Sequence, residues 1–103
     1  MNEDLTDDEL RQQLNKETGK LEWRELAPHF ARGAVILVDA HLDLIEVAAI
    51  MVRDDKSKVE AWIEERKVRR ADDEDARRWS TSHHLFWAVV AAPWVVVQEV
   101  VEN

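Results

Sequence analysis

His41 and Asp43 are the residues whose types and spacing come closest to a site of chemistry in this 103-residue chain. They put an imidazole and a carboxylate in one loop, between a predicted strand at 34–38 and a predicted helix at 44–53. Ligand sites often form at such places, because strand-end loops are held rigidly and the first amides of the next helix can bind an anion.

A ligand-binding or catalytic site at this loop would need further polar residues. Asp39 follows the same predicted strand, and His29 or Arg32 could lie beside it. The candidate site residues are therefore His29, Arg32, Asp39, His41 and Asp43. The simpler and commoner interpretation is that Asp43 only caps the following helix, while His41 is a solvated loop residue.

Other kinds of chemistry lack the residues that they need. The chain has no Cys, which excludes disulfides, thiolate nucleophiles and cysteine-ligated metal centres. Two glycines cannot build a P-loop or a dinucleotide fingerprint. The adjacent His83 and His84 would point to opposite sides of an extended segment, and no His-x-x-x-His spacing supports a metal site. We expect no metal and no cofactor.

The charge of the chain argues against two classes of partner. The formal net charge is −8 at pH 7, and such a field repels nucleic-acid phosphates and anionic lipid surfaces. Six basic residues between 66 and 78 are matched by six acidic residues between 64 and 75. The N-terminal segment lacks the apolar region of a signal peptide. We therefore expect no nucleic-acid partner, no membrane partner and a cytoplasmic location.

The stretch that must position the rest of the chain is Leu85–Val97, LFWAVVAAPWVVV, thirteen residues without a charged side chain. Such a run is too short to span a bilayer. Its β-branched and aromatic residues predict strands, and Pro93 divides them because it has no N–H for a strand ladder. The predicted strands are 85–91 and 94–99, joined by a tight turn. The apolar run at 34–38 predicts a third, buried strand.

Capping residues and helical spacing predict about five short helices. Thr6 with Glu9, and Ser57 with Glu60, have the spacing of a capping box. The expected helices are 7–18 with Gly19 as a left-handed cap, 22–32 with a break or restart at Pro28, 44–53, 57–67 and 72–82. The predicted fold class is α+β, in one domain over 1–103: a small three-stranded, mostly antiparallel sheet (34–38, 85–91, 94–99) packed with these helices.

A sheet with two apolar faces needs cover on both of them. Either the helices divide between the two faces, or a second copy of the chain covers one face, as in a homodimer. The interface candidates are Trp87, Trp94 and Val96, which lie in the predicted hairpin. The five Trp residues of the chain could instead belong to the core or line a ligand pocket, and their spacing does not separate these roles.

The segments LEWREL, FARGAVILV, LDLIEVAA and WAVVAAPWVVVQE together resemble a family of short bacterial proteins known only as domain of unknown function 2288. The similarity runs from about Leu14 to Glu99, nearly the whole chain. The resemblance implies a small, stand-alone, cytoplasmic bacterial protein. It brings no activity, cofactor, partner or catalytic residue.

Two functional hypotheses follow from these patterns. The first is a non-catalytic protein that works by self-association and by binding another protein, because the hairpin is apolar on both faces and no catalytic set converges. The alternative is a small enzyme or ligand-binding domain with its site at the strand-end loop around His41.

Overall fold

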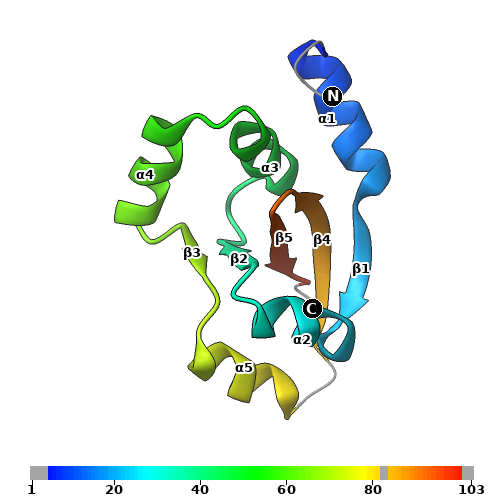
Figure 1. Ribbon diagram of the computed structural model, residues 1–103, viewed down its shortest axis with the longest axis vertical. Coiled ribbons are helices and arrows are strands. Elements are labelled where there is room, and N and C mark those ends of the chain that lie inside the picture. The colour runs from blue at the N-terminus through cyan, green and yellow to red at the C-terminus, as the bar shows by residue number, and fades with distance from the viewer. Residues whose placement is uncertain (1–4, 82–83, 101–103) are drawn as a thin grey trace.

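Helices and strands alternate along most of the chain in the computed structural model, which describes residues 5–81 and 84–100 (Figure 1). The elements are α1 Asp7–Glu17, β1 Gly19–Glu22, α2 Trp23–Ala31, β2 Val35–Val38, α3 Leu44–Val52, α4 Lys56–Glu64, β3 Val68–Arg70, α5 Asp73–Ser80, β4 Leu85–Ala91 and β5 Trp94–Glu99. The strands form one mixed sheet in the order β1-β4-β5-β2-β3. The predicted α+β class is therefore confirmed.

The hairpin of β4 and β5 is the centre of this sheet. Its two strands have the predicted bounds, and the turn between them contains a cis Ala92–Pro93 bond. β2 lies parallel to β5, with Val35 opposite Val95 and Leu37 opposite Val97. The pairs β1–β4, β4–β5 and β2–β3 are antiparallel. The buried strand predicted at 34–38 is thus present and joins the hairpin in parallel.

The prediction of only three strands was wrong, because β1 and β3 add one strand at each edge of the sheet. Both are short, and β1 reads GKLE while β3 reads VRR. Charged residues at sheet edges discourage pairing with other chains, but they also remove the apolar alternation that marks a strand. Tertiary pairing with the central strands, which the local sequence does not encode, makes these segments extended.

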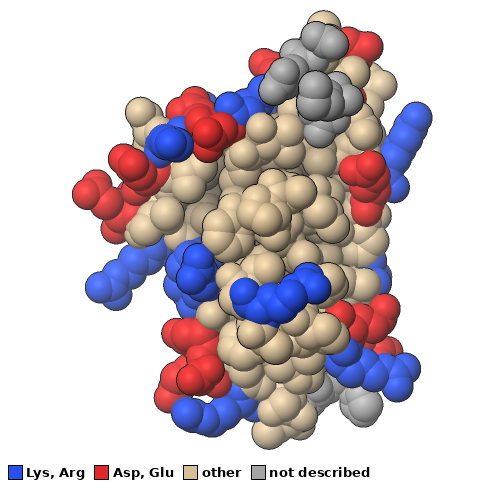
Figure 2. Space-filling view, in the orientation of Figure 1, with Lys and Arg blue, Asp and Glu red and all other residues tan. Residues whose placement is uncertain are grey.

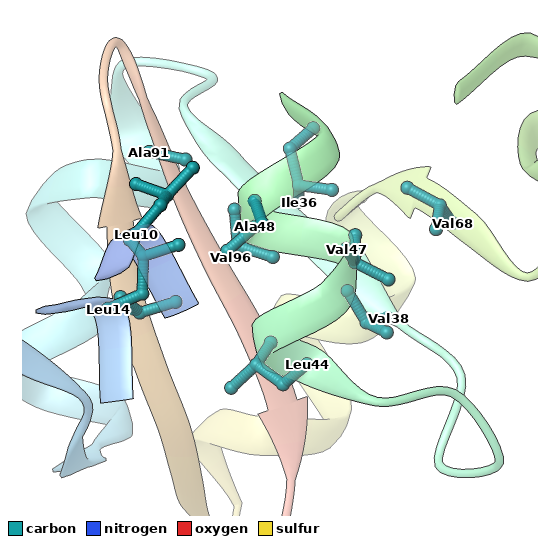
Figure 3. Packing of buried hydrophobic residues seen from close by; sticks show 12 residues of the cluster. Leu10, Leu14, Ile36, Val38, Leu44, Val47, Ala48, Val68, Ala91 and Val96 are labelled. Carbon is teal, nitrogen blue, oxygen red and sulfur yellow. The ribbon is translucent and has the colours of Figure 1, made fainter. Parts of the chain in front are cut away.

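Four helices cover the two faces of the sheet. This is the first of the two arrangements expected from the sequence, in which the helices divide between the faces. α1 and α3 pack on one face, where their apolar side chains meet those of β2, β4 and β5 (Figure 3). α2 and α5 pack on the other face, around Trp79 and Phe86. Within β5, Val96 belongs to the first core, while Val95 and Val97 belong to the second. This alternation is what the two-residue period of a strand requires.

Two of the three predicted capping residues, Thr6 and Asp43, cap the helices that follow them. The Thr6 and Glu9 capping box is present, and Asp43 accepts hydrogen bonds from the first amides of α3. α4 differs from its prediction, because Asp55 rather than Ser57 caps it and the helix ends at Glu64. α5 begins after Asp72, which forms a capping box with Asp75; its predicted end at position 82 lies outside the described residues.

The helix predicted to break at Pro28 runs through it without interruption. Proline at this position removes a single helical hydrogen bond, the one to the carbonyl of Arg24. Leu26 is fully buried and Phe30 packs against the same core. The packing of these two side chains holds the helix together across the missing bond.

Three helices end in the same left-handed motif. The residue after the C-cap has a positive φ in α2, α3 and α4: Gly33 at 72°, Asp54 at 59° and Arg66 at 61°. In each motif two amides reach back to the last turn; in α4 they run from Arg66 to Ile63 at 3.0 Å and from Lys67 to Trp62 at 2.9 Å. This is the Schellman arrangement. Gly19, by contrast, begins β1 and is not the left-handed cap that its type suggested.

Glycine should fit two of these caps better than the residues present. We expect Arg66→Gly to raise the free energy of unfolding by about 0.5–1 kcal/mol, because a non-glycine residue is strained at positive φ. Asp54→Gly should raise the free energy of unfolding by less than Arg66→Gly does, since aspartate tolerates positive φ better than arginine. Glu65→Gly, next to Arg66 but right-handed with φ −79°, is the control and should destabilise. Urea unfolding curves measure all three; a loss of stability in Arg66→Gly would contradict the strain argument.

Candidate functional site

The loop after β2 brings Asp39 and His41 together. The Asp39 carboxylate accepts a hydrogen bond from the His41 backbone amide at 2.8 Å and lies 2.9 Å from the His41 ring nitrogen Nδ1. These hydrogen bonds lower the pKa of Asp39 below its ordinary value. The His41 side chain is 96% exposed. The pair therefore sits on the surface, where a ligand could reach it but where water competes for each hydrogen bond.

Gln98 on β5 anchors this loop from the sheet. Its side-chain amide donates to the backbone carbonyls of Asp39 at 2.8 Å and Leu42 at 2.7 Å. Asp43 is occupied as the cap of α3, accepting from the amides of Ile45 and Glu46. Sequence reasoning missed the role of Gln98, because the contact spans more than fifty residues of chain. Its only signal is a polar residue at the end of an apolar strand.

His29 and Arg32 lie at the other end of β2. His29 lies in the last turn of α2 and Arg32 is the C-cap of that helix. Arg32 Nη2 is 2.6 Å from His29 Nδ1. The four residues of β2 separate them from Asp39 and His41, a length of roughly 13 Å. The structure thus forms two pairs from the candidate residues, one at each end of the strand, and does not bring the pairs together.

The three interface candidates have different environments. Val96 is completely buried in the core of the chain itself. Trp87 is 40% exposed on the side of α1 and α3, with the Lys20 ammonium 4.9 Å from its ring centre. Trp94 is half-buried beneath the Arg70 guanidinium at 5.2 Å. Of the three, Trp87 is the most open to a partner.

The face covered by α2 and α5 is left open at the turn end of the hairpin. Val90 is 60% exposed there, although its neighbours Val89 and Ala91 are buried. It lines an open pocket of 210 Å³. We name the apolar part of this lining the hairpin-end surface: Gly19, Leu21, Ala88, Val90 and Val95. Figure 2 shows that uncharged residues fill most of the middle of the molecular surface in this view, while charged side chains gather toward the edges.

A polar network joins α5 to the ends of β3 and β5. Asp75 is 1% exposed, and its carboxylate accepts two hydrogen bonds from the Arg69 guanidinium at 2.7 and 2.9 Å. Hydrogen bonding from Arg69 holds the pKa of Asp75 at about 2. Arg78 bridges Asp75 and Glu99. The sequence showed only that the acidic and basic residues of this segment balance in charge; the burial of Asp75 depends on tertiary packing that their spacing does not reveal.

Glu99 closes this network at the end of β5. One carboxylate oxygen accepts from the Trp79 indole N–H at 3.0 Å and lies 2.8 Å from His84 Nε2. His83 lies outside the described residues. Within the described residues, no group of three His, Asp or Glu side chains could hold a metal ion. The network therefore acts through hydrogen bonds and ion pairs that tie α5 to the sheet.

Comparisons with known proteins place the chain in a family. No curated protein matches it. A solved structure that does match is the NMR solution structure of PA1075 from Pseudomonas aeruginosa, with 41% sequence identity, 99% of this chain and 94% of that chain covered, and a TM-score of 0.80. Over residues 5–81 and 84–100, no helix is long and apolar enough to cross a membrane. Residues 9–99 match the family described as protein of unknown function, DUF2288, and the chain belongs to that family.

Proposed function

We propose that the protein is a non-catalytic binding module that forms a homodimer through the hairpin-end surface. The observation that carries this proposal is the 60% exposure of Val90, which lies between the buried residues Val89 and Ala91 near the turn end of β4. An exposed apolar side chain that lies beside an apolar pocket is typical of an interaction site rather than of scattered surface residues. The same surface would also receive a protein partner of similar apolar character.

The strand edge beside Val90 supports a second copy as the occupant. β1 pairs only with Leu85–Ala88 of β4, so Val89–Ala91 have no strand neighbour on that side among the described residues. An open strand edge next to an apolar side chain favours pairing with another chain. A two-fold axis at this edge would place Val90 of one protomer near Val90 of its partner.

The charge distribution also favours the hairpin-end surface as the dimer interface. Each chain carries a formal net charge of −8, so two copies repel each other at long range. Interface cores are depleted in charged residues, and Glu17 is the one acidic residue in the lining of the pocket beside Val90. In this proposal Val90 takes the place of Val96, which the core of the protomer already uses. We further propose a bacterial, cytoplasmic setting, which the resemblance implies.

Val90→Lys is expected to convert the protein from a dimer to a monomer without unfolding it. A lysine at the centre of an apolar contact leaves a buried charge unpaired, which costs several kcal/mol of association energy. Sedimentation velocity over a dilution series measures the change. Micromolar dimerisation corresponds to roughly −8 kcal/mol, so a loss of several kcal/mol would leave the variant monomeric over the same dilution series.

Ile63→Lys provides the matched control, because Ile63 is 51% exposed on α4 and does not line the pocket beside Val90. It adds the same charge to an equally exposed apolar position and should leave the dimer intact. A wild-type protein that sediments as a monomer at every concentration would rule out the homodimer. Equal sedimentation of Val90→Lys and wild type would rule out this surface as the interface.

A further inference from the structure

A second pocket opens where β2 and β5 end. These strands run parallel, and ligands in sheets with parallel strands commonly bind outside the carboxyl ends. The pocket has a volume of 270 Å³. Its walls come from three parts of the chain that the fold brings together. These are the end of β2 with the loop after it (Leu37, Val38, Asp39 and Ala40), the α4–β3 connection with β3 (Arg66, Lys67 and Arg69), and the end of β5 (Glu99).

Most of the charged groups around this pocket already have partners. Arg69 is held by Asp75 in a two-point ion pair. Glu99 accepts from Trp79 and lies beside His84 and Arg78. These contacts neutralise much of the charge on that side. The Asp39 carboxylate, which also lines the pocket, is bonded to the His41 amide and lies beside the His41 ring. The wall that remains to decide what the pocket binds is the one with the other two basic residues.

Arg66 and Lys67 form that wall. Lys67 lies 3.0 Å from Glu65, and both of these side chains are substantially exposed, so their attraction is weak and easily shared with another anion. No ion pair joins Arg66 to any residue in the described ranges. In a chain of net charge −8, this pocket therefore presents an available guanidinium beside a loosely held ammonium.

The backbone holds Arg66 in place. It occupies the left-handed position of the Schellman motif at the end of α4, where glycine would fit with less strain. The two amide hydrogen bonds of that motif fix the Cα of Arg66 beside the strand ends. A guanidinium on a fixed backbone loses less freedom when it binds a ligand.

We propose that this pocket binds a small oxyanion, the carboxylate or phosphate group of a small molecule, through the Arg66 guanidinium assisted by the Lys67 ammonium. A planar guanidinium matches both groups with two parallel hydrogen bonds. The pocket lies at the end of β5, whereas the turn of the hairpin precedes the start of β5. The walls of the pocket share no residue with the hairpin-end surface. Ligand binding and dimerisation can therefore be tested separately.

The test is a titration of ¹⁵N-labelled protein followed by amide NMR shifts, with sodium phosphate in one series and sodium malate in the other. Chloride keeps the ionic strength constant. Saturable shifts centred on the amides of Ala40 and Lys67 are expected, and the series with the tighter binding shows whether phosphate or carboxylate is preferred. Shifts that fail to saturate in both series, or that spread over all surface cations, would overturn the proposal.

Three variants make the test specific. Arg66→Gly should weaken binding roughly tenfold through the lost charge-assisted hydrogen bonds, while its unfolding midpoint rises. Asp54→Gly relieves the same kind of backbone strain at the end of α3 and should bind the anion like wild type. Arg66→Lys keeps the charge and the strained backbone but loses the two-point hydrogen bonding, so its affinity should lie between those of Arg66→Gly and wild type. Wild-type affinity in Arg66→Gly would remove Arg66 from the site.

Discussion

Replacing Trp79 with alanine is expected to lower the free energy of unfolding by about 4 kcal/mol. Trp79 is fully buried on α5, with its ring centre 4.9 Å from that of Phe86 and 5.7 Å from that of Trp23. Alanine would remove these ring contacts and leave a cavity in the second core. It would also take away the indole N–H that donates to Glu99, so α5 would lose its main attachment to the sheet.

Unfolding by urea, followed by far-UV circular dichroism, measures this loss. Trp87→Ala is the control, because it removes the same side chain from a position that is 40% exposed, and we expect it to cost about 1 kcal/mol. A domain of this size has a total stability of about 5–15 kcal/mol, so Trp79→Phe serves as a milder second variant. It keeps most of the ring contacts and loses the hydrogen bond to Glu99. If Trp79→Ala cost no more than Trp87→Ala, the packing around α5 would be other than described.

Local patterns predicted the hairpin and most helix starts correctly. Leu85–Ala91 and Trp94–Glu99 were found with their exact bounds, because an unbroken apolar run divided by a proline leaves little choice. Thr6 and Asp43 were correct as caps, since a side chain that accepts from the first amides acts within one turn of its own position. These features depend on residues only a few positions apart.

Features that depend on distant parts of the chain were missed. β1 and β3 are strands because β4 and β2 lie beside them, and their charged residues carry no strand pattern of their own. Arg66 ends α4 in a left-handed conformation that is usually taken by glycine, so the helix was predicted too long. The parallel pairing of β2 with β5 also depends on how the intervening helices cross the sheet.

The candidate site was predicted in part, at the loop after β2. Asp39 and His41 do lie together there, yet the residues that complete the surroundings come from β3 and from the end of β5. The basic residues among them belong to the segment whose acidic and basic residues were found to balance, and Glu99 was predicted only as the end of a strand. Charge balance in the sequence says which residues can neutralise each other, whereas the fold decides that Arg69 pairs with Asp75 and leaves Arg66 without an ion pair in the described part of the chain.

Asp75→Asn is expected to lower the free energy of unfolding by about 3 kcal/mol at pH 7, because it leaves the Arg69 guanidinium without its buried counter-charge. Asparagine has nearly the same shape as aspartate and can still accept from the Asp72 backbone amide, so the loss reports the ion pairs of Asp75 with Arg69 and Arg78. Glu74→Gln is the control. It makes the same charge change one residue away on α5, where the side chain is well exposed, and surface substitutions of this kind change stability by less than about 0.5 kcal/mol.

The pH dependence of stability should identify Asp75 as the source of the effect. Its pKa is lowered from the ordinary 3.8 to about 2 in the folded protein, so the unfolded chain takes up the proton first as the solution is acidified. The stabilisation by this carboxylate is therefore complete above pH 3.8 and is lost as the pH falls toward 2, an effect of about 2 kcal/mol. Urea midpoints measured across that range should fall less steeply for Asp75→Asn than for wild type or Glu74→Gln. Parallel curves for all three proteins would mean that another carboxylate governs the acid limb, and that the Arg69–Asp75 pair contributes little to holding α5 against the sheet.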